Sequence, residues 1–220
     1  MSRQGMFKRK SAMEELYFSN FRKEDLDKLF DFWMTTLNIY GCPPKIINFF
    51  QEKRKEATEN MLKVWENHYP EETILELTRK GIYLGLPVIS NSYLGLYGLV
   101  GMVRNGYKRG YTDLNPNKII NDRITPSTLY FIYNIKDGRK ELVNIFPQKQ
   151  SFLTAEEGLA LCMHTDALIF NKCISFANSF YSNPNKSLGM CLSNGYPQLV
   201  WFENDSGGTW KLASRYYGYF

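Results

Sequence analysis

The sequence predicts an α+β protein in which an N-terminal helical segment packs on a mixed C-terminal unit with antiparallel strands and one capped helix. Three observations support this class. Apolar residues recur at helical spacing between residues 20 and 80, short apolar runs separated by Gly, Pro and Asn follow from residue 82, and Thr154 to Glu157 resembles a helix N-terminus. We therefore expect a flexible N-terminus (residues 1–19), a helical segment (20–80) and an α+β domain (81–220).

The helical segment contains two amphipathic stretches. Arg22 to Ile39 and Lys45 to His68 each place their apolar residues on one side, and Gly41 and Pro43-Pro44 separate them. The two stretches predict an antiparallel helical pair. A third, short helix is expected after Pro70 and ends at Gly81.

The C-terminal unit starts with strand signals. The clearest strands are Leu84 to Ile89 and Leu129 to Ile135, and the turn signal Lys136-Asp137-Gly138 predicts that Glu141 to Ile145 pairs back in a hairpin. Thr154 is expected to cap a helix that runs to about Lys172, with Glu157 reaching back to the cap amide. The last predicted strands are Ser187 to Leu192, Gln198 to Phe202 and Thr209 to Tyr216.

Charge and cysteine content limit the class of protein. The net charge of +5 is modest for 220 residues, which favours a contribution to solubility over a surface that binds nucleic acid. Cys42, Cys162, Cys173 and Cys191 form no CxxC pair and have apolar or small neighbours, which predicts buried thiols in a reducing compartment. No apolar stretch follows the basic residues near Met1, so we expect no secretory signal and a cytoplasmic location.

One uncharged segment is long enough to span a bilayer. Gly81 to Val103 lies between Arg79-Lys80 and Arg104 without a charge. Its glycines, its proline and its polar residues favour a buried strand and a turn over a membrane helix. We therefore expect no contact with a membrane.

Several short elements of the C-terminal part recur together in one family. They are Ile124-Thr125-Pro126, Leu129-Tyr130-Phe131-Ile132, Lys136-Asp137-Gly138, Leu153 to Leu161 with His164, Gly195-Tyr196-Pro197-Gln198-Leu199-Val200-Trp201, and Ala213-Ser214. Over roughly residues 85–220 the chain resembles an uncharacterised bacterial family, a domain of unknown function. The resemblance implies a common fold unit and no particular reaction.

Catalytic groups are few. Of the two histidines only His164 lies in the α+β domain, and it shares a helix face with Glu157, which suggests an acid-base pair; a histidine satisfied locally in the helix is the favoured alternative. Cys162, His164, Cys173 and Cys191 do not have the spacing of a zinc site, and Ser214 lacks the context of a nucleophile. The sequence predicts no metal and no cofactor.

The best basic cluster is Arg104 to Tyr111, with three cations and two tyrosines. Such a segment suits phosphates and stacked bases, although a solvated turn between strands has the same composition and is favoured. The terminal aromatics, Trp210 and Tyr216 to Phe220, either complete the core or form a contact patch. Core completion is the favoured interpretation.

Three functions follow from these candidates, and the sequence leaves open whether the chain is an enzyme. The first is a soluble, cytoplasmic, non-enzymatic binding or interaction module that contacts a protein partner or a small ligand. The alternative is a small-molecule enzyme that uses Glu157 and His164 around a cleft lined by Trp201 and Trp210. The third is weak phosphate or nucleic-acid binding through residues 104–111, although nucleic acid is the less favoured partner. The candidate contact residues are Arg104, Lys108, Arg109, Trp201, Trp210, Ser214 and Arg215.

Overall fold

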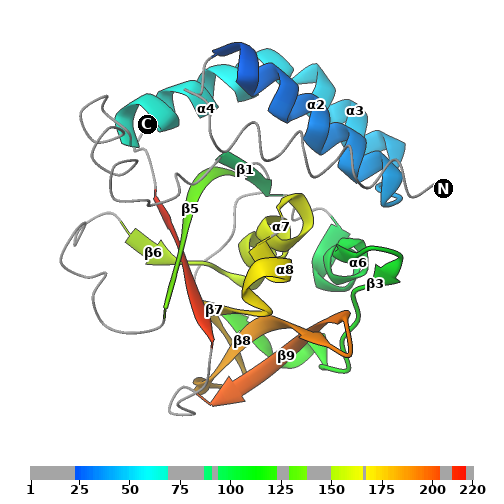
Figure 1. Cartoon of the computed structure of the whole chain (residues 1–220), viewed down its shortest axis with the longest axis vertical. Coiled ribbons are helices and arrows are strands. Elements are labelled where there is room, and N and C mark those ends of the chain that lie inside the picture. The colour runs from blue at the N-terminus through cyan, green and yellow to red at the C-terminus, as the bar shows by residue number, and fades with distance from the viewer. Residues whose placement is uncertain are drawn as a thin grey trace.

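The computed structural model describes residues 23–68, 87–90, 94–122, 129–137, 150–165, 167–203 and 210–216. Helices α2 (Lys23–Ile39), α3 (Pro44–Glu52) and α4 (Arg54–His68) lie together on one side of the strand-rich part of the chain (Figure 1). The strands follow in the C-terminal part and pair mostly antiparallel. The predicted α+β class is confirmed.

The second amphipathic stretch is two helices, α3 and α4, rather than one. They are separated by Lys53, whose N–H donates to the carbonyl of Phe50 at 3.2 Å. No Gly or Pro marks this point in the sequence. Tertiary contacts position it, because Arg54, the first residue of α4, donates to the carboxylate of Asp31 at 2.6 Å and to that of Asp27 at 3.3 Å on α2.

The main sheet holds eight strands within the described residues. In space their order is β1 (Pro87–Ser90), β5 (Leu129–Asp137), β10 (Lys211–Tyr216), β7 (Cys173–Tyr181), β8 (Asn183–Ser193) and β9 (Tyr196–Glu203), with β4 (Ile119–Asn121) on β7 and β6 (Gln150–Phe152) on β10. All these pairs are antiparallel except β10 with β7, which is parallel. A separate hairpin consists of β2 (Arg104–Asn105) and β3 (Lys108–Arg109).

Most of the predicted strands are confirmed. The runs beginning at Leu129, Ser187 and Gln198 are β5, β8 and β9, and the final run is β10. The described part of the first run is β1. The described neighbours of β5 are β1 and β10, whereas the predicted partner strand at residues 141–145 and the short helix after Pro70 lie outside the described residues.

The predicted helix from Thr154 to about Lys172 is two helices rather than one. Helix α7 (Ala155–His164) ends at Thr165, which has an extended backbone with φ −133° and ψ 166°. The Thr165 hydroxyl donates to the carbonyl of Leu161 at 2.7 Å and accepts the N–H of Ala167 at 3.2 Å, so it closes α7 and starts α8 (Ala167–Asn171). Lys172, at φ 63°, then turns the chain into β7, a strand that the sequence analysis missed.

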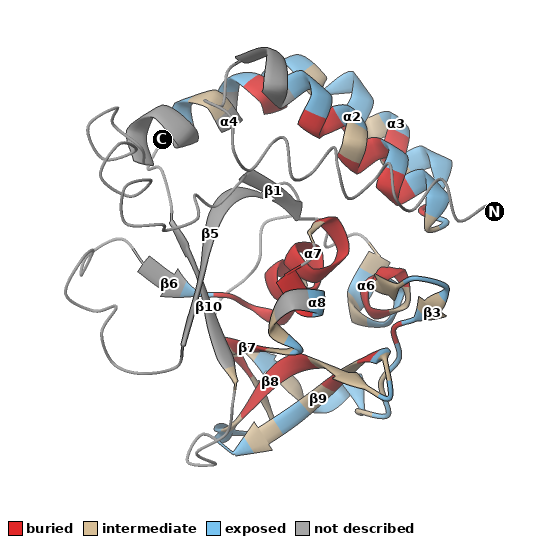
Figure 2. Cartoon of the chain, in the orientation of Figure 1, coloured by how far each residue is buried: buried red, intermediate tan, exposed pale blue. Residues whose placement is uncertain are grey.

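Helix α7 is the centre of the core. Nine of its ten residues are buried, and it contacts β7, β8, β1 and helix α6 (Gly95–Met102) (Figure 2). On its other side the ring of His164 lies 5.9 Å from that of Trp33 on α2. The buried side chains of the N-terminal helices, α7 and the sheet therefore form one contiguous cluster. The uncharged segment before Arg104 contributes β1 and α6, and among the described helices none is long and apolar enough for a membrane span.

Gly158 sets the distance between α7 and the sheet. A Cβ atom at this position would lie 2.1 Å from the ring carbons of Phe176 on β7. We expect Gly158→Ala to reduce the free energy of unfolding by about 2 kcal/mol, because either the helix or the ring must move in a closely packed core.

The matched control is Gly101→Ala on α6, where the nearest atom to the new Cβ is Nη2 of Arg109 at 3.6 Å. That variant should stay within about 1 kcal/mol of the original chain, since an alanine favours the helix. Urea denaturation followed by circular dichroism measures both. Equal midpoints for the two variants would contradict close packing at Gly158.

Candidate functional site

Glu157 and His164 lie on the same buried helix but not at one surface. Glu157 is fully buried, and its Oε2 accepts the N–H of Thr154 at 3.0 Å as part of the predicted capping box. His164 is 2% exposed at the other end of α7 and contacts Trp33. Seven residues correspond to a rise of about 10 Å along a helix. The structure therefore does not bring these two groups to one reacting atom, which a shared acid-base step requires.

Trp201 and Trp210 lie on opposite faces of the sheet. Trp201 stacks on Tyr181 with ring centroids 6.4 Å apart, and the Nζ of Lys186 lies 4.2 Å above its ring. Trp210 stacks at 3.9 Å on Phe202, the next residue of β9, whose side chain points to the other face. Within the described residues, the two tryptophans therefore do not face one another.

Ser214 and Arg215 belong to β10, between β5 on one side and β6 on the other. Ser214 is opposite Asn134 and Phe152, and Arg215 is opposite Tyr133 and Ser151. Their backbones are thus inside the sheet. The end of the aromatic tail, residues 217–220, lies outside the described residues. In the part of the chain that the structure describes, no three His, Cys, Asp or Glu side chains form a group suited to a metal ion.

The basic cluster forms the β2–β3 hairpin beside α6. Gly106, at φ 62°, allows the tight turn, and Tyr107 at its tip is 87% exposed. Two side chains fix the hairpin to the turn between β8 and β9, because Asn105 donates to the carbonyl of Gly195 at 2.8 Å and Lys108 donates to that of Asn194 at 2.7 Å. The hairpin is therefore a firmly held turn.

The chain after the hairpin continues along β9. The N–H of Tyr111 donates to the carbonyl of Pro197, and the N–H of Leu199 donates to the carbonyl of Tyr111, both at 3.0 Å. The chain at Tyr111 therefore lies parallel to β9. It occupies the hydrogen-bonding edge that β9 would otherwise present to solvent. This pairing extends the attachment of the hairpin to the sheet.

Arg104 and Arg109 are directly opposite each other in the hairpin. The N–H of Gly110 donates to the carbonyl of Val103 at 2.9 Å, so Val103 and Gly110 form a hydrogen-bonded pair. The next pair, Arg104 and Arg109, is therefore non-hydrogen-bonded, the kind in which side chains lie closer together. Burial lowers the pKa of Arg104, and the positive charge of Arg109 lowers it further. Within the described residues neither guanidinium forms an ion pair with a carboxylate.

Local contacts orient the two guanidiniums. That of Arg104 lies 5.4 Å from the centre of the Tyr40 ring, and Nε of Arg109 donates to the carbonyl of Gly101 at 3.3 Å. Arg54 offers a contrast within the same chain, because its hydrogen bond with Asp31 raises its pKa. The hairpin thus places two positive charges side by side, whereas Arg54 has two carboxylates next to it.

Lys108, on the other face of the hairpin, also contacts an aromatic ring. The Nζ of Lys108 lies 4.5 Å above the ring of Tyr196, which is 43% exposed at the start of β9. We use the term hairpin surface for Arg104, Tyr107, Lys108, Arg109 and Tyr196, with the arginine pair on one face of the hairpin and Lys108 with Tyr196 on the other. The three cations are evident in the sequence, whereas the contribution of Tyr196 depends on a contact between segments far apart in the sequence.

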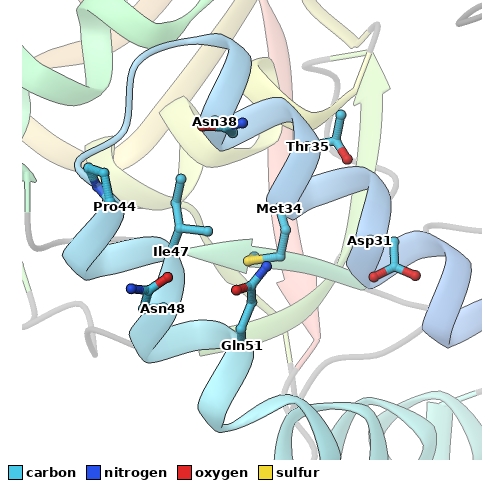
Figure 3. A pocket seen from close by; sticks show the side chains of 8 residues that line it. All are labelled: Asp31, Met34, Thr35, Asn38, Pro44, Ile47, Asn48 and Gln51. Atoms are coloured by element: carbon cyan, nitrogen blue, oxygen red, sulfur yellow. The ribbon is translucent and has the colours of Figure 1, made fainter.

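A groove between α2 and α3 is a second feature of the N-terminal helices (Figure 3). It has a volume of about 460 Å³ and contains none of the residues selected from the sequence. Its one charged side chain, Asp31, is paired with Arg54, and the other lining groups are neutral. The lining of the groove therefore provides amide groups and a hydroxyl but no unpaired acid or base for catalysis. Its lining residues are Asp31, Met34, Thr35, Asn38, Pro44, Ile47, Asn48 and Gln51.

Comparison with known proteins gives no assignment: no family model, no curated protein and no solved structure matches the chain. The resemblance of residues 85–220 to the bacterial family stays a prediction. The candidate site is therefore interpreted from its own residues.

The assignment of Glu157 to the helix cap leads to a stability prediction. Glu157→Ala removes the acceptor of the Thr154 N–H and should reduce the free energy of unfolding by about 1–2 kcal/mol. Glu157→Gln keeps a carbonyl acceptor at the same place and should lose less than half as much. Thermal denaturation compares the two variants. Equal losses would show that the negative charge, rather than the cap hydrogen bond, is what α7 requires.

Proposed function

We propose that this chain is a non-enzymatic, cytoplasmic interaction module that captures an acidic segment of a protein partner on the hairpin surface. The observation that carries the proposal is the directly opposed pair Arg104 and Arg109, which has no carboxylate partner within the described residues. The other residues of the surface supply aromatic contacts and a third cation.

A carboxylate is a suitable ligand for the arginine pair. Each guanidinium presents N–H donors in a planar fork that matches the two oxygens of a carboxylate. A bound anion would also relieve the repulsion that contributes to the lowered pKa of Arg104. Charge-assisted hydrogen bonds of this kind are about twice as strong as neutral ones.

The tyrosines favour a protein segment as the source of that anion. Tyr107 and Tyr196 are exposed next to the cations, and tyrosine and arginine are the residue types enriched in protein interfaces. The hydrogen bonds from Asn105 and Lys108 to the β8–β9 turn hold the surface in place before binding. A preorganised surface loses less conformational entropy when a partner binds.

The same arginine pair supports a second candidate, phosphate or nucleic-acid binding through residues 104–111. This function requires rows of phosphate contacts and stacked bases, and its affinity falls steeply with salt. The hairpin presents only the arginine pair on one face and Lys108 on the other, which is no row of phosphate contacts, so the acidic protein segment is the favoured ligand. The small-molecule enzyme is the least supported function, because Glu157 and His164 are buried at opposite ends of α7.

A labelled deca-glutamate peptide tests the proposed surface. Fluorescence anisotropy should detect binding to the original chain, and Arg109→Gln should weaken it about tenfold, as expected for the loss of one charge-assisted interaction. The matched control is Lys118→Gln, which removes one exposed positive charge from the short helical turn Pro116–Lys118. This control should change the dissociation constant less than twofold.

Two results would contradict the proposal. An equal loss in the Lys118→Gln variant would mean that the peptide responds to net charge only. Tighter binding of an oligothymidylate of the same length, with a steep dependence on salt, would favour the nucleic-acid function instead. Circular dichroism of each variant confirms that the compared chains are folded.

A further inference from the structure

Two of the four cysteines are direct neighbours on adjacent strands. Cys173, the first residue of β7, is opposite Cys191 of β8 in an antiparallel pair. Directly opposed residues of such a pair point to the same face of the sheet. From the sequence both cysteines were candidate metal ligands or buried thiols, and Cys191 was also weighed as a nucleophile, whereas strand β7 was not predicted.

The two cysteines occupy the kind of strand pair in which side chains approach most closely. The N–H of Leu192 donates to the carbonyl of Lys172 at 2.8 Å, so the pair next to the cysteines is the hydrogen-bonded one. Cys173 and Cys191 are therefore a non-hydrogen-bonded pair, with Cα atoms typically about 4.5 Å apart. That separation lies at the short end of the range that disulfides span.

Both thiols are half-buried, and neither is part of a disulfide. Burial, a side-chain hydrogen bond with Cys173 and the charge on Cys173 all raise the pKa of Cys191. The Cys191 thiol is accordingly protonated at neutral pH, unlike the activated thiolate of a catalytic cysteine. Of the other two cysteines, Cys42 is buried on the loop after α2 and Cys162 is buried on α7, and the charge on Cys162 also raises the pKa of Cys191.

We propose that Cys173 and Cys191 form a reversible dithiol site that closes to a disulfide when a low-molecular-weight disulfide such as oxidised glutathione reacts with it. One cysteine gives up its proton, and its thiolate attacks the glutathione disulfide to form a mixed disulfide; the glutathione thiolate that leaves takes up a proton. The second cysteine sulfur then attacks the mixed disulfide, forms the Cys173–Cys191 bond and releases the second glutathione thiol. The protein loses two protons and two electrons, and both are recovered in the two glutathione molecules.

The site also defines a class of ligand. Two thiols on one face of a sheet match trivalent arsenicals, which bind two sulfur atoms at once. Neither thiol alone provides that chelation. Phenylarsine oxide is therefore a probe of the two reduced thiols. Oxidised glutathione tests whether the same two thiols close to a disulfide.

The test uses the full chain, first with phenylarsine oxide and then with oxidised glutathione. Mass spectrometry under native conditions should find one arsenical per chain in the original protein and none in Cys173→Ser and Cys191→Ser. After oxidation, peptide mapping without reductant should join the peptides that contain Cys173 and Cys191. The matched control Cys42→Ala removes a buried thiol elsewhere and should behave like the original chain in both assays.

Three results would overturn the proposal. The first is retention of one arsenical by either serine variant. The second is stable glutathione adducts on both cysteines of the original chain, and the third is a disulfide between two copies of the chain in place of the internal one. Reduction with dithiothreitol must restore the original mass, since an irreversible change would exclude a reversible site.

Discussion

The structure depends on the close approach of α7 to the sheet. Gly158 allows this approach, because the ring of Phe176 occupies the place of a Cβ atom. With α7 at this distance, its opposite side meets Trp33 through His164, and the N-terminal helices share one core with the strands. A displaced α7 would separate the two halves of that core. The capping box of Thr154 and Glu157 satisfies the buried start of the same helix.

The central position of α7 also bears on where we propose that recognition occurs. The only titratable pair that the sequence offered for acid-base chemistry is part of this helix, and both members are buried in structural roles. The β2–β3 hairpin lies instead at the edge of β9, where Asn105 and Lys108 are held by the β8–β9 turn and Lys108 contacts Tyr196. We therefore place recognition on this peripheral hairpin and structural support on α7. The dithiol pair at the start of β7 is a separate feature and does not depend on the binding proposal.

The sequence predicted those elements whose formation depends on residues close to one another along the chain. The apolar spacing of residues 22–39 gave α2, the Thr154–Glu157 pattern gave the start of α7, and the Asn194-Gly195 turn separated β8 from β9. The features that the sequence did not reveal depend on contacts between distant segments. Thr165 ends α7 with its own side-chain hydrogen bonds, and β7 is a strand because β8, β10 and β4 pair with it. For the same reason, strand register decides that Arg104 faces Arg109, and the stacking of Trp210 on Phe202 places it on the sheet face opposite Trp201.

Hydrogen–deuterium exchange with and without the deca-glutamate peptide tests this division of roles most directly. The account predicts that the amides of α7 are among the slowest to exchange in both states, because the helix is buried and central. It also predicts that the peptide slows exchange in residues 104–111 and leaves α7 unchanged. Slowed exchange at α7 with no change in the hairpin would contradict the account, since it would move recognition to the helix that we assign to structural support.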